Sequence, residues 1–128
     1  MRIDINIEEE PTLAERGLRA AARYLRMRGC EILDGHTKRG DGTDGMVVVD
    51  EDGVLRFVDV RTSVEGGSGW FDCETGERGE REGQAMEWLF ASGLEGEMPF
   101  AFDCISIVNA KDSRRAVLRY HMNVFGGM

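Results

Sequence analysis

The sequence predicts an α/β domain in which helices flank a central mixed β-sheet. Segments with the period-two pattern of strands alternate with segments that carry helical spacing, in the order strand, helix, three strands, helix, two strands. Two central segments are apolar on both faces, as expected for strands that other layers cover on both sides. The length of 128 residues fits one domain that spans residues 1–128.

The N-terminal part predicts a strand followed by a helix. Residues 2 to 7 alternate between isoleucine and polar side chains, which is typical of a strand with one buried face. Within an N-terminal extension of residues 1 to 10, we expect this segment to be an edge strand; pairing across a dimer is the other interpretation. A helix is expected over residues 12 to 28, because apolar residues recur there at intervals of four, three and four. They are Ala14, Leu18, Ala21 and Leu25.

The same helix carries a basic stripe. Its members recur at intervals of three, four and three: Arg16, Arg19, Arg23 and Arg26. A solvated helix face is the simpler interpretation of this stripe, and a phosphate-facing surface for DNA or RNA is the sharper one. The net charge of −8 favours the solvated face, because the phosphate backbone repels an acidic chain.

The rest of the chain predicts five strands and one more helix. A strand should begin at residues 30 to 33, and two more should cover 46 to 49 and 54 to 60 around an acidic turn. Residues 62 to 79 predict a long glycine-rich loop, in which Trp70 and Phe71 either fold back onto the core or stack on a base or partner. A helix is expected over residues 80 to 92, with Trp88 in the core. Strands over 100 to 108 and 116 to 120 follow, and Asp103 is expected to pair with an arginine.

The candidate chemical site consists of Asp44 and Asp59 on neighbouring strands, with Arg61 two residues further on. If residues 51–52 form the hairpin loop, Asp44 lies opposite Asp59; if residues 52–53 form it, Asp44 lies opposite Arg61. Both registers bring the three residues to one sheet face, whereas an even register separates them. Two close carboxylates are the minimum set for holding Mg²⁺ or Mn²⁺, which would orient a water and stabilise a phosphoryl transition state. Turn capping and an exposed pair at a strand end are the structural alternative.

Asp44 with Asp59-Val60-Arg61 resembles the PD-(D/E)xK nuclease motif, and the chain from about Gly17 to Phe125 resembles the YraN family of small uncharacterised proteins. The residues that carry the resemblance are Ala21-Ala22-Arg23-Tyr24-Leu25, Gly29, Arg39-Gly40, Phe57-Val58-Asp59-Val60-Arg61-Thr62, Ala85, Trp88-Leu89, Phe102-Asp103 and Asn123-Val124-Phe125. The resemblance implies a restriction-endonuclease-like core. It also implies catalytic roles for Asp44 and Asp59, as ligands of Mg²⁺ or Mn²⁺, and for Arg61, which would stabilise charge on the phosphate.

The chain also departs from the family pattern. The glutamate of the first helix is Leu18, and the glutamate of the Gly-Glu-Ile-Asp stretch is Gly42. The lysine of the Glu-x-Lys pattern is Arg61, which stays protonated and cannot act as a base. Acidic residues replace the lysines of the second helix: Glu77, Glu80 and Glu82. These changes remove candidate metal ligands and phosphate contacts, so the resemblance implies weakened or absent nuclease chemistry.

Two functions follow from these observations. The first is a metal-dependent endonuclease with a degenerate site. The second is a catalytically inactive module that kept the nuclease fold and binds nucleic acid through the four arginines, or binds a protein. The absence of a long apolar run predicts no membrane span, and both a monomer and a homodimer fit. Because Cys30, Cys73 and Cys104 form no C-x-x-C pair, reduced thiols in a cytoplasmic protein are expected.

Overall fold

The computed structural model describes residues 11–40, 42–64, 77–94, 98–109 and 115–125. Two helices and five strands make up this part of the chain: α1 (Leu13–Met27), β1 (Glu31–Lys38), β2 (Asp44–Val49), β3 (Leu55–Val64), α2 (Arg78–Ser92), β4 (Phe100–Asn109) and β5 (Ala116–His121). The strand expected over residues 2 to 7, and the loop residues Trp70 and Phe71, lie outside the described residues.

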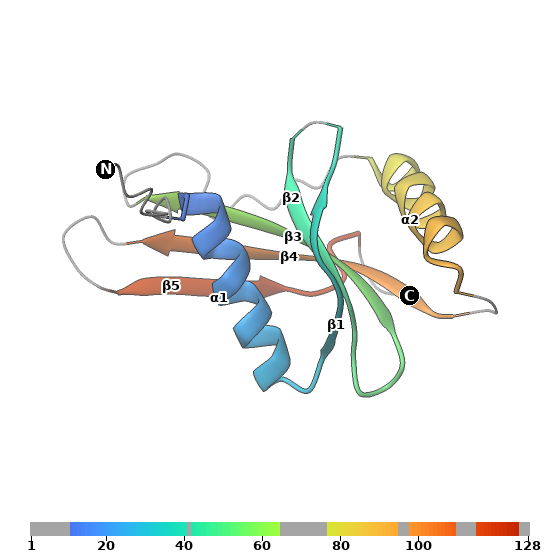
Figure 1. Ribbon diagram of the computed structural model, residues 1–128, viewed down its shortest axis with the longest axis horizontal. Helices are drawn as coiled ribbons and strands as arrows, with labels where there is room; N and C mark the ends of the chain where they lie inside the picture. The colour runs from blue at the N-terminus through green and yellow to red at the C-terminus, as the bar shows by residue number, and fades with distance from the viewer. Residues whose placement is uncertain (1–10, 41, 65–76, 95–97, 110–114, 126–128) are drawn as a thin grey trace, which may run out of the picture.

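The five strands form one sheet in the order β1-β2-β3-β4-β5. Neighbouring strands are antiparallel except for β3 and β4, which run parallel. A parallel pair requires a crossover, and the segment that contains α2 provides it. The expected α/β class with a mixed sheet and flanking helices is therefore confirmed, and Figure 1 shows the two helices against different parts of the twisted sheet.

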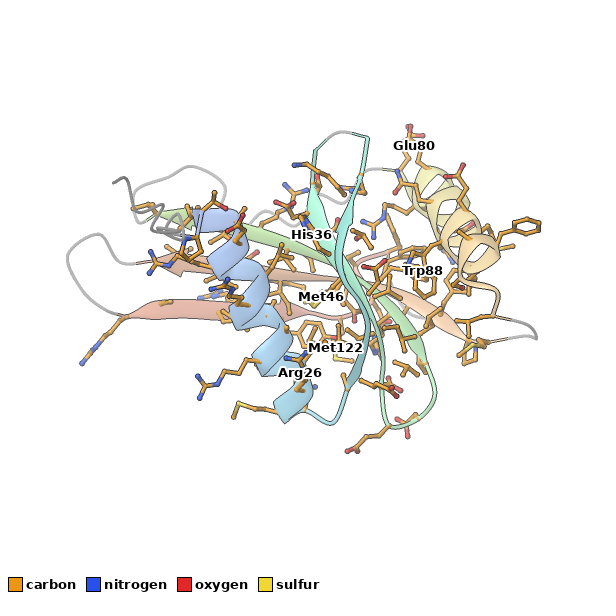
Figure 2. The ribbon with its side chains drawn as sticks, in the orientation of Figure 1. Arg26, His36, Met46, Glu80, Trp88 and Met122 are labelled. Carbon is orange, nitrogen blue, oxygen red and sulfur yellow. The ribbon has the colours of Figure 1, made fainter. Side chains whose placement is uncertain are left out.

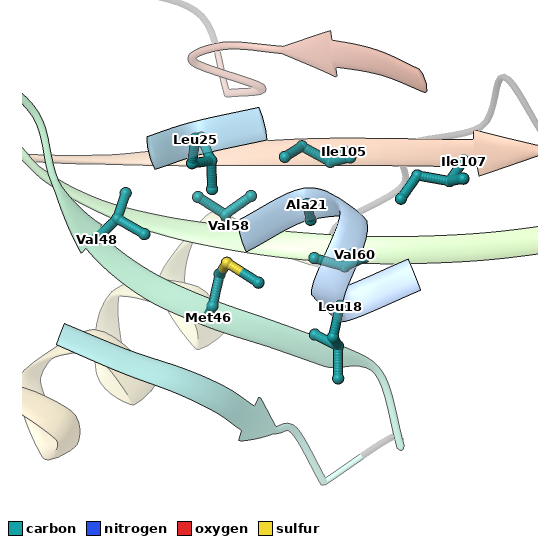
Figure 3. Packing of buried hydrophobic residues seen from close by; sticks show 9 residues of the cluster. All are labelled: Leu18, Ala21, Leu25, Met46, Val48, Val58, Val60, Ile105 and Ile107. Carbon is teal, nitrogen blue, oxygen red and sulfur yellow. The ribbon is translucent and has the colours of Figure 1, made fainter. Parts of the chain in front are cut away.

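Helix α1 covers one sheet face. Thr12 begins it with a capping box, in which its side chain accepts from the Glu15 N–H while the Glu15 carboxylate accepts from the Thr12 N–H. The predicted apolar stripe is buried at Leu18, Ala21 and Leu25, whereas Ala14 is exposed. Figure 3 shows the stripe packed on side chains from the three neighbouring strands. They are Met46, Val48, Val58, Val60, Ile105 and Ile107.

Helix α2 covers the opposite face, where a second core lies. Val47, Leu55, Phe57, Ala85 and Phe102 are its buried members. Trp88 packs against this cluster as a half-buried side chain, which agrees with its expected place at the core (Figure 2). Its indole N–H donates to Asp34 Oδ2 on β1 over 3.0 Å, so the ring also ties α2 to the sheet edge.

The hairpin between β2 and β3 has neither of the two expected registers. Val49 lies opposite Leu55 and Asp44 lies opposite Val60, which leaves a three-residue loop, residues 51–53. Gly53 has a φ of 79°, as in hairpin loops that end in a left-handed residue. The Asp50 carboxylate accepts from the backbone N–H groups of Asp52 and Val54 at 2.9 and 3.0 Å and so holds this turn. The expectation of a two-residue loop is therefore wrong.

A buried polar network joins β3, β4 and β5 beneath α1. Asp103 is fully buried and accepts from Arg56 Nη1 at 3.0 and 3.1 Å, from the Tyr120 hydroxyl at 2.5 Å and from the Asn123 N–H at 2.9 Å. Arg56 also donates from Nε to Asp50 Oδ2 over 2.9 Å. The expected pairing of Asp103 with an arginine is confirmed. The four hydrogen bonds satisfy a carboxylate that would be costly to bury alone.

Candidate functional site: a cationic pocket around Asp59

The structure does not bring Asp44 and Asp59 together. Directly opposed residues of an antiparallel pair share a face, and the partner of Asp59 is Gly45 while that of Asp44 is Val60. Asp44 therefore lies on the α1 face, with Oδ1 2.8 Å from His36 Nε2, and Asp59 lies on the α2 face. The prediction of one carboxylate pair on a common face is wrong, because the three-residue turn moves the register by one residue.

Asp59 is instead enclosed by arginines. Its side chain is 3% exposed, and Oδ2 lies 2.5 Å from Arg81 Nη1 and 3.3 Å from Arg39 Nη2. Burial raises the pKa of Asp59, while the charges of Arg81, Arg39 and Arg61 act to lower it. Of the predicted site residues, Asp59 and Arg61 thus lie within electrostatic reach of one another.

Arg81 holds its position through α2. It is 4% exposed, and its guanidinium carbon lies 5.1 Å from the centre of the Phe102 ring, which is cation–π geometry. Arg81, Ala85 and Trp88 recur at intervals of four and three and share the inner face of the helix. Sequence reasoning missed Arg81 because acidic residues surround it. An arginine in register with an apolar stripe was the available signal.

A pocket of about 430 Å³ opens beside Asp59. Its walls come from the end of β1, from the chain that follows it, from β2, β3 and β4, and from the inner face of α2. Asp59, Arg39 and Arg81 line it together with aromatic side chains. The pocket therefore combines charged side chains with an apolar aromatic wall, as small-ligand sites commonly do.

The donor set does not fit the expected Mg²⁺ or Mn²⁺. In the part of the chain that the structure describes, no group of three or more His, Cys, Asp or Glu side chains is placed to hold a metal ion. Asp59 directs its carboxylate at two guanidinium groups, and a cation would have to displace them. Gly42 and Leu18, which stand where the family has glutamates, add no ligand.

The basic stripe of α1 is where the sequence predicts it. Arg16, Arg19, Arg23 and Arg26 are all exposed, and Arg26 is labelled near the end of the helix in Figure 2. Because α1 and α2 cover opposite faces, the stripe and the Asp59 pocket are separate surfaces. Exposure agrees with both interpretations of the stripe.

One of the cysteine expectations is wrong. Cys104, which lies beside Asp59 in the β3–β4 pairing, is disulfide-bonded and not a reduced thiol. Cys30 is the free cysteine of the described residues, and burial raises the pKa of its thiol.

Comparison of the sequence with protein-family models and with curated proteins found no match. Within the described residues, neither helix has the length and apolar character needed to cross a membrane.

Proposed function

We propose that this protein is a catalytically inactive binding module that keeps a restriction-endonuclease-like core of the YraN type. The observation that carries the proposal is the environment of Asp59, whose carboxylate is neutralised by Arg81 and Arg39. A nuclease of this kind needs that carboxylate for a metal and needs a second one beside it. Here Asp44 faces the other side of the sheet.

A nucleic acid is the proposed partner, DNA or RNA, and the four arginines of α1 are the proposed contact surface. The first and the last of them, Arg16 and Arg26, are ten residues apart along the helix, which is about 15 Å at the α-helical rise and enough for several phosphates along one strand. The net charge of −8 opposes this contact over longer distances, so binding should be weak and strongly salt-dependent. A protein partner and residual metal-dependent cleavage are the competing functions.

A binding and cleavage assay with fluorescent DNA and RNA, in Mn²⁺, tests the proposal. We expect binding without cleavage, in both the wild type and Asp59→Asn. Cleavage by the wild type that Asp59→Asn abolishes would overturn the proposed inactivity. Cleavage that survives the substitution would show that the chemistry lies away from Asp59.

The salt dependence of binding tests the contact surface separately. If all four arginines meet phosphates of a duplex, log K should fall with log salt at a slope of about −3.6. Arg19→Ala with Arg23→Ala should reduce the slope to about −1.8, because two phosphate contacts are lost. Arg119→Ala, an exposed arginine of β5, is the matched control and should leave the slope unchanged. Equal slopes in all three proteins would exclude α1 as the surface.

A further inference from the structure

We infer that the pocket beside Asp59 binds a small planar aromatic acid, a ligand with a carboxylate and a ring N–H or O–H group. This site goes beyond the proposed function, because it lies on the α2 face, away from the arginines of α1. Its volume of about 430 Å³ falls within the range of roughly 300 to 1,000 Å³ that is usual for small-ligand pockets.

The aromatic wall sets the shape of the ligand. Phe57 meets Trp88 and Phe102 with ring centres 5.8 Å apart in both pairs, and all three side chains line the pocket. The Phe57 and Trp88 rings are nearly perpendicular, at 85°. A planar ring would add further edge-to-face or offset contacts on this wall, so aromatic ligands should be preferred over aliphatic ones.

The charge balance of the side chains that line the pocket sets the sign of the ligand's charge. Lys38, Arg39 and Arg81 provide three positive charges, against two carboxylates from Asp59 and Glu87. One positive charge is therefore in excess, in a chain whose net charge is −8. Since Arg39 and Arg81 already bind Asp59, the ammonium of the exposed Lys38 is the cation best placed to receive an added carboxylate.

Gln84 sets the third requirement, a hydrogen-bond donor on the ring. Its Oε1 is buried and has no hydrogen-bond partner among the described residues, and its side chain lines the pocket. A buried acceptor that is left unsatisfied costs stability, so a ligand that supplies an N–H or O–H group there gains affinity. The three features together favour an aromatic acid with a ring donor over a simple anion or a neutral ring.

Calorimetry with indole-3-carboxylate as the probe tests the inference on the full chain. We expect saturable binding. Neutral indole, which lacks the charge, and 1-methylindole-3-carboxylate, which lacks the N–H, should both bind about tenfold more weakly. Equal affinity for indole and indole-3-carboxylate would overturn the inference, as would no binding of the probe. Tighter binding of inorganic phosphate or adenosine monophosphate would overturn it as well, in favour of a phosphate site.

Two variants locate the site. Lys38→Gln should weaken the binding of indole-3-carboxylate roughly fivefold, which is the upper range for the loss of an exposed ion pair. Gln84→Leu should abolish the difference between the probe and its N-methyl analogue. Arg119→Gln removes an exposed cation that does not line the pocket and should leave both affinities unchanged. If Arg119→Gln weakens binding of the probe as much as Lys38→Gln does, the electrostatic attraction is non-specific and the assignment of the site is wrong. Failure of this test would leave nucleic-acid binding by α1 untouched.

Discussion

The side chains that contact Asp59 decide what its carboxylate can do. A carboxylate that is 3% exposed needs compensation for its charge, and Arg81 and Arg39 provide it. The same contacts occupy the carboxylate that a metal would need. At this position, charge pairing and metal binding are therefore competing uses of one side chain.

Replacing one residue of the Asp59–Arg81 pair should lower the free energy of unfolding more than replacing both. We expect Arg81→Met to lower the free energy of unfolding by about 3 kcal/mol, because Asp59 is left buried with less compensation. Adding Asp59→Asn to Arg81→Met should restore part of the lost stability, because the buried side chain at position 59 then carries no charge. Urea unfolding of the two single variants and the double variant measures the coupling. Additive effects would contradict a direct interaction between the two side chains.

Asp50 predicts a pH-dependent contribution to stability. Burial acts to raise its pKa, but hydrogen bonds from the Val54 N–H, the Arg56 side chain and the Asp52 N–H outweigh it and lower the pKa below the ordinary 3.8. The carboxylate therefore stabilises the fold above the unfolded pKa, and this contribution is lost as the pH falls through the folded pKa.

Asp50→Asn should consequently be destabilising near neutral pH and progressively less so in acid. The difference in unfolding free energy between wild type and variant should be constant above about pH 5, and it should shrink as the pH falls below the ordinary 3.8 toward the lowered folded pKa. Urea unfolding across this range measures it. A difference that stays constant would show that Asp50 acts through hydrogen-bond geometry alone and not through its charge.

At the scale of elements, the close approach of α1 to β3 depends on a glycine. A Cβ added at Gly17 would overlap the Thr62 hydroxyl and lie 2.9 Å from Thr62 Cβ, so the helix or the strand would have to move. We expect Gly17→Ala to lower stability by about 1 to 3 kcal/mol, as overpacking does.

Gly83→Ala in α2 is the matched control, because nothing lies within 4 Å of the added Cβ. It should raise stability by about 0.5 to 1 kcal/mol through helix propensity. Thermal or urea unfolding compares the two variants. Stabilisation by both substitutions would show that α1 does not pack on β3 at Gly17.

The elements also show where sequence reasoning succeeds. The helix expected over residues 12 to 28 is α1, and the one expected over 80 to 92 is α2, because apolar spacing reports the buried face of a helix directly. The strand registers were not predictable in the same way. One residue in the turn at 51–53 decides which face Asp44 occupies, and the acidic turn sequence allows two-residue and three-residue loops alike.

For the whole molecule, the α/β class could be predicted, whereas the composition of the site could not. Arg39, Arg81 and Asp59 meet only after β1, β3 and α2 assemble, and no local pattern encodes that meeting. Sequence order alone could nominate Asp59 and Arg61, but not the groups that neutralise Asp59. The nuclease-like core, the cytoplasmic location and the nucleic-acid partner stay predictions, and the disulfide at Cys104 is unusual for the cytoplasm.

The most direct test of the central claim, that Asp59 serves charge pairing and not metal binding, is a Mn²⁺ titration followed by the broadening of backbone amide signals. We predict no saturable broadening centred on Asp59 in the wild type, because Arg81 and Arg39 occupy the carboxylate and Asp44 lies on the other face. Asp59→Asn and Asp44→Asn are the paired controls. Saturable broadening around Asp59 that both substitutions abolish would contradict the claim and reinstate a two-carboxylate metal site.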